Sequence, residues 1–168
     1  MAADRERVTS HGVPVVLGDL RAGERDALFA LFAAVVEAKE GFPEQPPLTA
    51  EAFAAAWDPP RIAVVARLGA GLAGAYSLRP NFPGRAAHVA NAGYVVDARF
   101  RRQGIGRVLV EDSLEQAKAL GFDAMQFNLV FASNPARLLY EELGFEVTGR
   151  VPSAVEGEDA FVYWRRLE

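Results

Sequence analysis

The stretch VVDARFRRQGIGRVLVE, residues 95–111, joins an apolar run to a helical pattern through a short basic turn. β-Branched residues at its start are typical of a strand, and apolar residues at helical spacing follow Gly104 and Gly106. Four arginines surround these glycines in a chain whose formal net charge is -4. A helix start exposes backbone N–H groups, and glycines let such groups converge on an anion. The stretch therefore predicts a strand–turn–helix unit that binds a phosphate group.

Two well-known nucleotide-binding motifs do not fit this turn. A Walker turn needs Gly-Lys-Ser/Thr, but arginine and valine follow Gly106. A dinucleotide fingerprint needs a third glycine at the position where Leu109 stands. The pattern that remains is Arg101-x-x-Gly104-x-Gly106 after a strand. Its alternative interpretation is a surface loop shaped by the glycines, whose arginines only contact water.

Outward from this turn, strand patterns and helix patterns follow one another without a repeat or a linker. Strands are predicted at residues 13–17, 61–68, 72–78, 88–96, 124–131, 145–151 and 159–167. Helices are predicted at residues 24–40, 50–57, 104–120 and 134–143, with Thr49 as the cap of the second. Residues 1–12 are polar, and we expect a flexible arm there, ahead of a single α/β domain at residues 13–168.

Composition limits the classes of function. The 168 residues suffice for one domain with a full core, and 51% of them are hydrophobic. A pI near 5.3 argues against general nucleic-acid binding. No apolar run could span a bilayer and no signal-peptide core opens the chain, so we expect a cytoplasmic protein that does not bind membranes. Cysteine is absent, and His11 and His88 lack nearby partners, so we expect no metal site.

Two longer stretches resemble the GNAT superfamily, the acetyl-coenzyme A-dependent N-acetyltransferases. The stretch GYVVDARFRRQGIGRVLVEDSLEQAKALGF, residues 93–122, resembles the cofactor-binding motif of that superfamily. The stretch NPARLLYEELGF, residues 134–145, resembles its second motif. Two motifs in the right order are more specific than either alone. The resemblance implies one GNAT-type domain, whose mixed, mostly antiparallel sheet is splayed at the cofactor cleft and flanked by about four helices.

The resemblance also implies how acetyl-coenzyme A is bound. Backbone N–H groups of the turn would hold its pyrophosphate, and its pantetheine arm would pair with the edge of the preceding strand. Gly93 would suit a bulge at which the central strands separate. Asn134 stands one position later than the asparagine of many members. The implied cofactor-binding residues are Tyr94, Val95, Val96, Arg101, Arg102, Gln103, Gly104, Ile105, Gly106, Arg107, Asn134 and Tyr140.

The stretches HVANAGYVV and MQFNLVFASN are similar to acetyltransferases that act on proline analogues such as azetidine-2-carboxylate. That resemblance implies that Asn91 and Asn128 bind the substrate, and that Asn128 and Asn134 take part in catalysis. An alternative follows from the cost of burying an unbonded amide. Asn91 and Asn128 would then satisfy the backbone where the strands diverge, and Asn128 could serve both purposes.

The expected chemistry is the attack of a neutral amine on the acetyl thioester, with a backbone N–H near Tyr94 stabilising the carbonyl oxygen. By the resemblance, the hydroxyl of Tyr140 faces the departing sulfur. Reference pKa values of about 10 for a phenol and about 8.5 for a thiol make full proton transfer uphill. A hydrogen bond to the thiolate is thus as plausible as proton donation. The alternative role of Tyr140 is packing in the core.

The general base is not evident from the sequence. The stretch HVANAGYVV contains no carboxylate, and Asp97 behind it is expected to point into the turn. His88 has a suitable ordinary pKa of about 6.5, but a lone histidine is more often structural. Glu37 and Glu40, late in the first helix, are further candidates. A water relay ordered by Asn128 or Asn134 would replace a base.

The sequence thus predicts an N-acetyltransferase that acts on a small amine, in particular an amino acid or an analogue. Two alternatives stay open, namely acetylation of a peptide N-terminus or lysine, and a domain that holds coenzyme A without turnover. A homodimer is also expected, for which the stretch FVYWRRL, residues 161–167, offers a strand edge.

Overall fold

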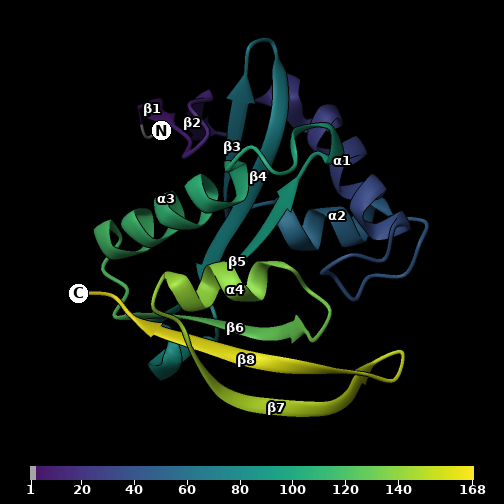
Figure 1. Cartoon of the computed structure of the whole chain (residues 1–168), viewed down its shortest axis with the longest axis vertical. Coiled ribbons are helices and arrows are strands. Elements are labelled where there is room, and N and C mark those ends of the chain that lie inside the picture. The colour runs from purple at the N-terminus through teal and green to yellow at the C-terminus, as the bar shows by residue number, and fades with distance from the viewer. Residues whose placement is uncertain (1–2) are drawn as a thin grey trace. The chain divides into compact units, whose positions relative to one another are not determined.

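The computed structural model describes residues 3–168, which form eight strands and four α-helices (Figure 1). The strands are β1 (Arg5–Val8), β2 (Pro14–Asp19), β3 (Ile62–Leu68), β4 (Gly71–Pro80), β5 (Val89–Val96), β6 (Ala124–Phe131), β7 (Glu146–Val155) and β8 (Glu158–Arg166). The helices are α1 (Arg25–Glu37), α2 (Ala50–Trp57), α3 (Ile105–Ala119) and α4 (Ala136–Glu142). Within residues 3–168, no helix has the length and apolarity that crossing a membrane requires.

The strands form one sheet in the order β1-β2-β3-β4-β5-β6-β8-β7. β5 and β6 run parallel, whereas the ladders β1–β2, β2–β3, β3–β4, β6–β8 and β7–β8 are antiparallel. A parallel pair needs a crossover connection, and α3 supplies it between β5 and β6. The predicted fold, a mixed and mostly antiparallel sheet with four helices, is confirmed.

The chain divides into two compact units. The first comprises the residues up to Leu78 together with Gly93–Ser113, and the second comprises Arg79–Ala92 together with Leu114–Glu168. The chain passes from one unit to the other within β4, β5 and α3. The glycine turn therefore belongs to the first unit, and α4 belongs to the second.

The core of the first unit lies between α1, α2 and one face of the sheet. α1 carries apolar residues at helical spacing, and α2 places Phe53 and Trp57 beside them. The ring of Phe32 lies 5.7 Å from that of Trp57, in an edge-on arrangement. Burying one such side chain contributes about 1.5–3 kcal/mol. The buried cluster consists of Leu28, Leu31, Phe32, Val35, Val36, Phe53, Trp57, Val65, Ala75 and Val95.

Thr49 caps α2 as the sequence predicts. Its Oγ1 accepts a hydrogen bond from the backbone N of Ala52, at 3.1 Å. Asp58 follows the helix and pairs with Arg25 at the start of α1. The cap stabilises the start of α2, and the ion pair joins its end to the start of α1.

The expectation of a flexible arm at residues 1–12 is wrong for the part that the structure describes, and residues 1 and 2 lie outside it. β1 pairs with β2, with Arg5 opposite Leu17. Arg5 donates from Nε and Nη2 to the two carboxylate oxygens of Asp112 on α3, each at 2.7 Å. Asp112 is 1% exposed and also accepts from the Tyr76 hydroxyl at 2.7 Å. The polar N-terminal segment is ordered because its arginine neutralises a buried carboxylate.

In the second unit, β8 lies between β6 and β7. Met125 of β6 stands opposite Arg165 of β8, and Val147 of β7 stands opposite Tyr163 of the same strand. β8 thus has a partner on each side, so the expected dimer edge at residues 161–167 is wrong. The outer strand is β7, which continues through Pro152 to Val155, where the sequence led us to expect a loop.

Candidate active site

The turn before α3 has the backbone shape of an anion-binding nest. Asp97 caps the short helical turn that follows β5, since its Oδ1 accepts from the backbone N of Arg99 at 2.9 Å. Arg102 and Gly104 then adopt left-handed conformations, with φ of +59° and +83°, on either side of Gln103. α3 begins directly after Gly104. Alternation of this kind turns successive N–H groups toward one point at the positive end of a helix.

The two glycines of the turn have different surroundings. A Cβ atom at Gly104 would lie 2.9 Å from the Cβ of Thr9 and 3.1 Å from the Oγ of Ser10, so only glycine fits. A Cβ atom at Gly106 would meet Val96 at 3.9 Å, which is an ordinary contact. The β1–β2 hairpin, which contains Thr9, therefore supports the turn from behind Gly104.

Three of the four arginines around the turn have carboxylate partners. Arg99 pairs with Asp97 at 2.8 Å and, through this hydrogen bond, lowers the pKa of that carboxyl. Arg101 pairs with Glu40, which follows α1, and Arg107 lies 3.6 Å from Glu111 one helical turn later. These partners reduce the positive charge that the sequence suggested for the turn.

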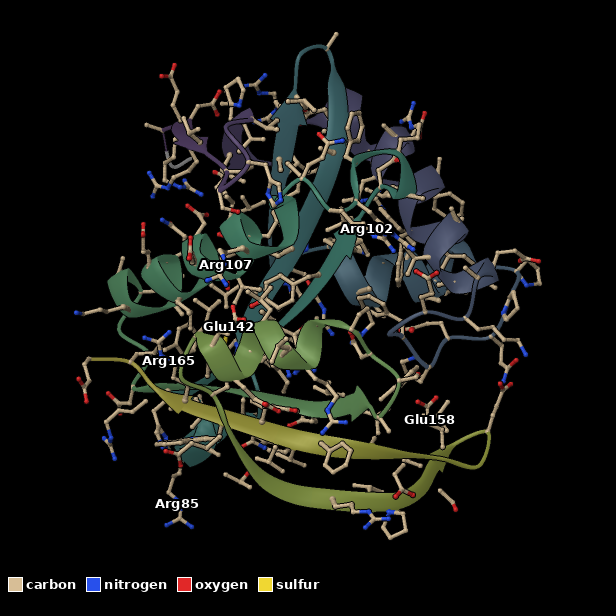
Figure 2. The ribbon with its side chains drawn as sticks, in the orientation of Figure 1. Arg85, Arg102, Arg107, Glu142, Glu158 and Arg165 are labelled. Atoms are coloured by element: carbon tan, nitrogen blue, oxygen red, sulfur yellow. The ribbon has the colours of Figure 1, made fainter. Side chains whose placement is uncertain are left out.

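Arg102 is exposed and has no carboxylate partner within residues 3–168. Figure 2 shows it at the turn, with Arg107 on the first turn of α3. Of the four arginines, Arg102 is thus the one whose guanidinium can bind an anion without first breaking an ion pair with a carboxylate of residues 3–168.

The strand before the turn is the last strand of the first unit's sheet. The backbone N of Asp97 bonds to the carbonyl of Ala73 on β4 at 2.9 Å. The hydroxyl groups of Tyr94 and Ser113 are 2.7 Å apart, whereas Val95 is buried in the α1–α2 core. Side chains thus fix both faces of the strand. Pairing of its backbone with an extended ligand stays a prediction.

An aromatic ring lies close to Gly93. A Cβ atom there would lie 3.2 Å from the Phe42 ring, which comes from the α1–α2 loop. Phe42 itself packs edge-on against Phe32, with the ring centroids 4.9 Å apart. The loop that carries Phe42 is thereby held against the centre of β5.

A pocket of about 590 Å³ lies beside the turn within the first unit. Small and apolar residues of α1, such as Ala30 and Ala34, form one wall. The opposite wall comes from β4 and from the residues after β5, and the Glu40–Arg101 pair also lines the pocket. Alanines on a helix are also typical of plain packing, so the residue pattern of α1 did not distinguish a pocket wall from core.

Asn91 and Asn128 lie in the second unit and are joined through Gln126. Asn128 exchanges two side-chain hydrogen bonds with Asn81, at 2.7 and 3.1 Å, and also accepts from Gln126 Nε2 at 3.0 Å. Asn91 donates from Nδ2 to the backbone carbonyl of Gln126 at 2.9 Å. This bond lies next to the pairing of Ala90 with Met125 in the β5–β6 ladder. Asn91 thus bonds the backbone, as the alternative interpretation of the sequence has it, whereas Asn128 bonds the side chains of Asn81 and Gln126.

Asn134 shapes the start of α4. Its Oδ1 accepts from the backbone N of Ala136 at 2.9 Å, and its carbonyl accepts from the N of Arg137 at 3.2 Å. The Nδ2 group of Asn134 makes no hydrogen bond within residues 3–168. The side chain therefore has one end engaged in the helix start and one end that can still donate.

Tyr140 is buried in an aromatic cluster of the second unit, with 7% of its surface exposed. Its ring centroid lies 4.7 Å from that of Phe127 and 5.8 Å from those of Phe145 and Tyr163. Burial, and secondarily the neighbouring Tyr163, raises the pKa of the Tyr140 hydroxyl. A weaker acid gives up its proton less readily, so this hydroxyl is suited to donating a hydrogen bond to a thiolate rather than to transferring the proton.

None of the three expected candidates for the general base lies in surroundings that suit a base. Glu37 is exposed, Glu40 pairs with Arg101, and the Nδ1 of His88 lies 3.2 Å from the carbonyl of Arg85. Glu44, in the α1–α2 loop, has a buried Oε2 that has no hydrogen-bond partner in the described part of the chain. The sequence did not indicate Glu44, because a glutamate between prolines resembles any exposed loop residue.

Comparison with known proteins gives the family context. A model described as the acetyltransferase (GNAT) family matches residues 28–145. The N-acetyltransferase aca1 of Schizosaccharomyces pombe is 39% identical over 94 residues, which are 54% of this chain and 45% of that protein. The chain thus spans less than half the length of the curated relatives that it matches.

Solved structures agree in fold. A GCN5-related N-acetyltransferase from Kribbella flavida is 33% identical, with a TM-score of 0.84, and the match covers 91% of this chain and 98% of that one. A GNAT phosphinothricin acetyltransferase from Sinorhizobium meliloti, solved with acetyl-coenzyme A, is 20% identical, with a TM-score of 0.79. That match covers 91% of this chain and 88% of that one, and it supports the fold alone.

Proposed function

We propose that this chain, which belongs to the GNAT family of acetyltransferases, transfers the acetyl group of acetyl-coenzyme A to the amine of a small molecule, in particular an amino acid or an analogue. The observation that carries the cofactor part of this proposal is the turn before α3. Its left-handed residues, Arg102 and Gly104, turn backbone N–H groups toward one point at a helix start. A diphosphate is the group of coenzyme A that such a point would bind.

When bound, acetyl-coenzyme A supplies an activated thioester, and the chain supplies position and polarity. The N–H groups from Arg102 to Arg107 would hold the diphosphate, with Arg101 and Arg102 adding charge. The backbone of Tyr94, Val95 and Val96 would pair with the extended arm. A backbone N–H near Tyr94 would stabilise the carbonyl oxygen as negative charge develops on it.

The second unit would contribute side chains that interact with the departing thiol or with the cofactor. Tyr140 keeps its proton because burial raises the pKa of its hydroxyl, so it would stabilise the thiolate by a hydrogen bond. Asn134 would contact the cofactor through its Nδ2. Asn128 would act through the amides that it orders, since its own Oδ1 and Nδ2 are bonded to protein.

Glu44 is the carboxylate that best suits the role of proton acceptor. Its Oε2 is buried without a partner, and Phe42, two residues earlier, holds the same loop against Gly93. A buried, unbonded carboxylate oxygen has a strong tendency to accept a hydrogen bond, and an amine can provide one. The water relay ordered by asparagines then becomes unnecessary.

A panel of amines tests the proposal. Purified protein is mixed with acetyl-coenzyme A and one amine, and release of free thiol is measured for proline, azetidine-2-carboxylate, common amino acids and a lysine peptide. We expect turnover with the small amines and little with the peptide. Turnover with the peptide alone, or no heat on titrating coenzyme A into the protein, would contradict the proposal.

A homodimer remains part of the proposal, with β7 as the strand that would meet its copy. β7 is the outer strand of the second unit, and its Val147 and Val151 are 47% and 41% exposed. Equilibrium sedimentation measures the mass directly, and a single species of 18.2 kDa would rule the dimer out.

A further inference from the structure

Arg79, near the end of β4, is a charged residue with a buried nitrogen that no group of residues 3–168 satisfies. Its Nε is buried without a hydrogen-bond partner. Its Nη1 donates to the backbone carbonyls of Pro80 and Asn81, each at 3.1 Å. Within residues 3–168 it has no carboxylate partner. A buried N–H group without an acceptor is costly, so the orphaned Nε favours the addition of an oxygen acceptor, such as that of a ligand.

The backbone places Arg79 beside the polar residues of the second unit. The N of Asn81 bonds to the carbonyl of Val89 at 2.7 Å, which sets the register between β4 and β5. Counting two residues back along β4 and two forward along β5 puts Arg79 opposite Asn91. Opposed residues of paired strands project from the same face.

Arg79 also adjoins the bonded amides. It donates to the carbonyl of Asn81, whose side chain is paired with that of Asn128. Gln126 completes the set, because it bonds Asn128 with its side chain and Asn91 with its carbonyl. Asn81, Asn91, Gln126 and Asn128 are called the amide cluster below.

The chemistry of this group favours a carboxylate. The amides of the cluster are neutral and bond one another or backbone, so by themselves they attract an anion less strongly than a charged group does. A guanidinium carries a permanent charge, and two of its nitrogens can bind the two oxygens of a carboxylate side by side. The amide cluster would thus orient Arg79 and shape the space around it, while Arg79 supplies the attraction.

We infer that Arg79 binds the carboxylate of the acceptor, which makes the acceptor an amino acid or an analogue that carries its amine and its carboxylate close together. This inference rests on the proposed function and narrows it. Amines whose carboxylate is masked as an amide, including the termini and lysines of peptides, become poor acceptors. The amide cluster then serves recognition indirectly, through the arginine that it adjoins.

Matched acceptors test this inference without any change to the protein. L-Proline and L-prolinamide, and L-alanine and L-alaninamide, differ in the carboxylate and keep the amine. We expect kcat/KM to be about 10- to 100-fold higher for the acids, the range that charge-assisted hydrogen bonds provide, once each rate is corrected for the fraction of neutral amine. Equal values for acid and amide would overturn the inference and leave the proposed acetyl transfer intact.

Variants locate the effect. Arg79→Met should remove the preference for the acid chiefly through KM, and Arg79→Lys should restore part of it. Arg85→Met is the matched control, because Arg85 is an exposed arginine of the same unit (Figure 2) and should keep the preference of the unchanged protein. An Arg79→Met protein that still prefers the acid would overturn the inference.

Calorimetry adds a readout that needs no turnover. With coenzyme A present, N-acetyl-L-proline should bind the unchanged protein more tightly than N-acetyl-L-prolinamide does. The difference should vanish in Arg79→Met and should be kept in part in Arg79→Lys. Binding of the two products with equal affinity would overturn the inference. Failure of coenzyme A itself to bind would instead contradict the proposed function, so the two failures are distinguishable.

Discussion

Gly104 and Thr9 are in such close contact that a single carbon atom added to the glycine would stand 2.9 Å from the Cβ of the threonine. The two residues are far apart in the sequence, yet together they connect the β1–β2 hairpin with the turn that precedes α3. The shape of that turn therefore depends on the hairpin as well as on its own glycines.

Replacing Gly104 by alanine should weaken both the fold and cofactor binding. The left-handed backbone at this position, with φ of +83°, costs a side chain roughly 1–2 kcal/mol, and the contact with Thr9 adds to it. We expect a lower melting temperature and coenzyme A affinity reduced by about tenfold or more, measured by calorimetry. Gly106→Ala is the control, because its Cβ has room and a helical alanine gains up to about 1 kcal/mol. Equal melting temperatures for the two variants would contradict this account.

Replacing Arg5 by methionine should destabilise the protein by about 3–5 kcal/mol, the cost of leaving one member of a buried pair without its partner. Asp112, which is 1% exposed, would lose two hydrogen bonds from the guanidinium. Arg7→Met is the matched control, because Arg7 lies 3.7 Å from Asp112 and its side chain is 36% exposed. Urea unfolding measures both. If the two variants lost equal stability, β1 would not hold the fold in the way described.

Replacing Tyr140 by phenylalanine should lower kcat by roughly 10²-fold, as removal of one donor to developing charge does. The ring would keep its place beside Phe127, so stability should change little. Thiol release measures the rate, and calorimetry with coenzyme A serves as the control, since binding should persist. An unchanged kcat would assign Tyr140 to packing alone.

Alkaline pH should destabilise the protein through its buried tyrosines. Burial raises the pKa of both Tyr76 and Tyr140 in the folded state. The unfolded chain releases these protons near its ordinary pKa of about 10, while the folded chain retains them, so the free energy of unfolding falls above about pH 10. Urea unfolding between pH 8 and 11 measures the slope. Tyr140→Phe should make the slope shallower, and an unchanged slope would contradict the assignment.

Replacing Glu44 by glutamine should lower kcat by roughly 10²-fold or more, if its buried oxygen receives the proton of the amine. Coenzyme A should bind as before. Glu37→Gln is the control, because Glu37 is an exposed residue at the end of α1 and should keep full activity. Full activity in Glu44→Gln would contradict this role and indicate that water accepts the proton of the amine.

The sequence predicted those parts of the molecule that local pattern determines. Strand β6 has the predicted bounds, Thr49 caps α2, and the GNAT family and fold are confirmed. The sequence-based prediction was wrong where the structure of a segment depends on a residue far away in the sequence. β1 resembled a loose polar arm because nothing near Arg5 in the sequence reveals a buried aspartate more than a hundred residues later.

The same limit applies to the candidate site. Asparagines that interrupt apolar strands indicated a polar site. The hydrogen bonds between Asn128 and Asn81, however, are known only from the structure. Arg79 and Glu44 gave no local signal, since arginine at a strand end and glutamate in a proline-rich loop are ordinary. Each of them became a candidate because one of its polar atoms is buried without a hydrogen-bond partner, and a sequence pattern does not reveal this. The roles assigned to the site residues stay predictions until the variants are measured.

Because the hairpin supports Gly104, a fragment of this chain that keeps the glycine turn in place must include the hairpin. The family pattern begins at residue 28, well after Thr9. A fragment cut at that family boundary would keep every recognisable motif but lose the surface on which the glycine turn rests. Fragments intended for crystallisation or for grafting into other acetyltransferases should therefore start at or before Arg5.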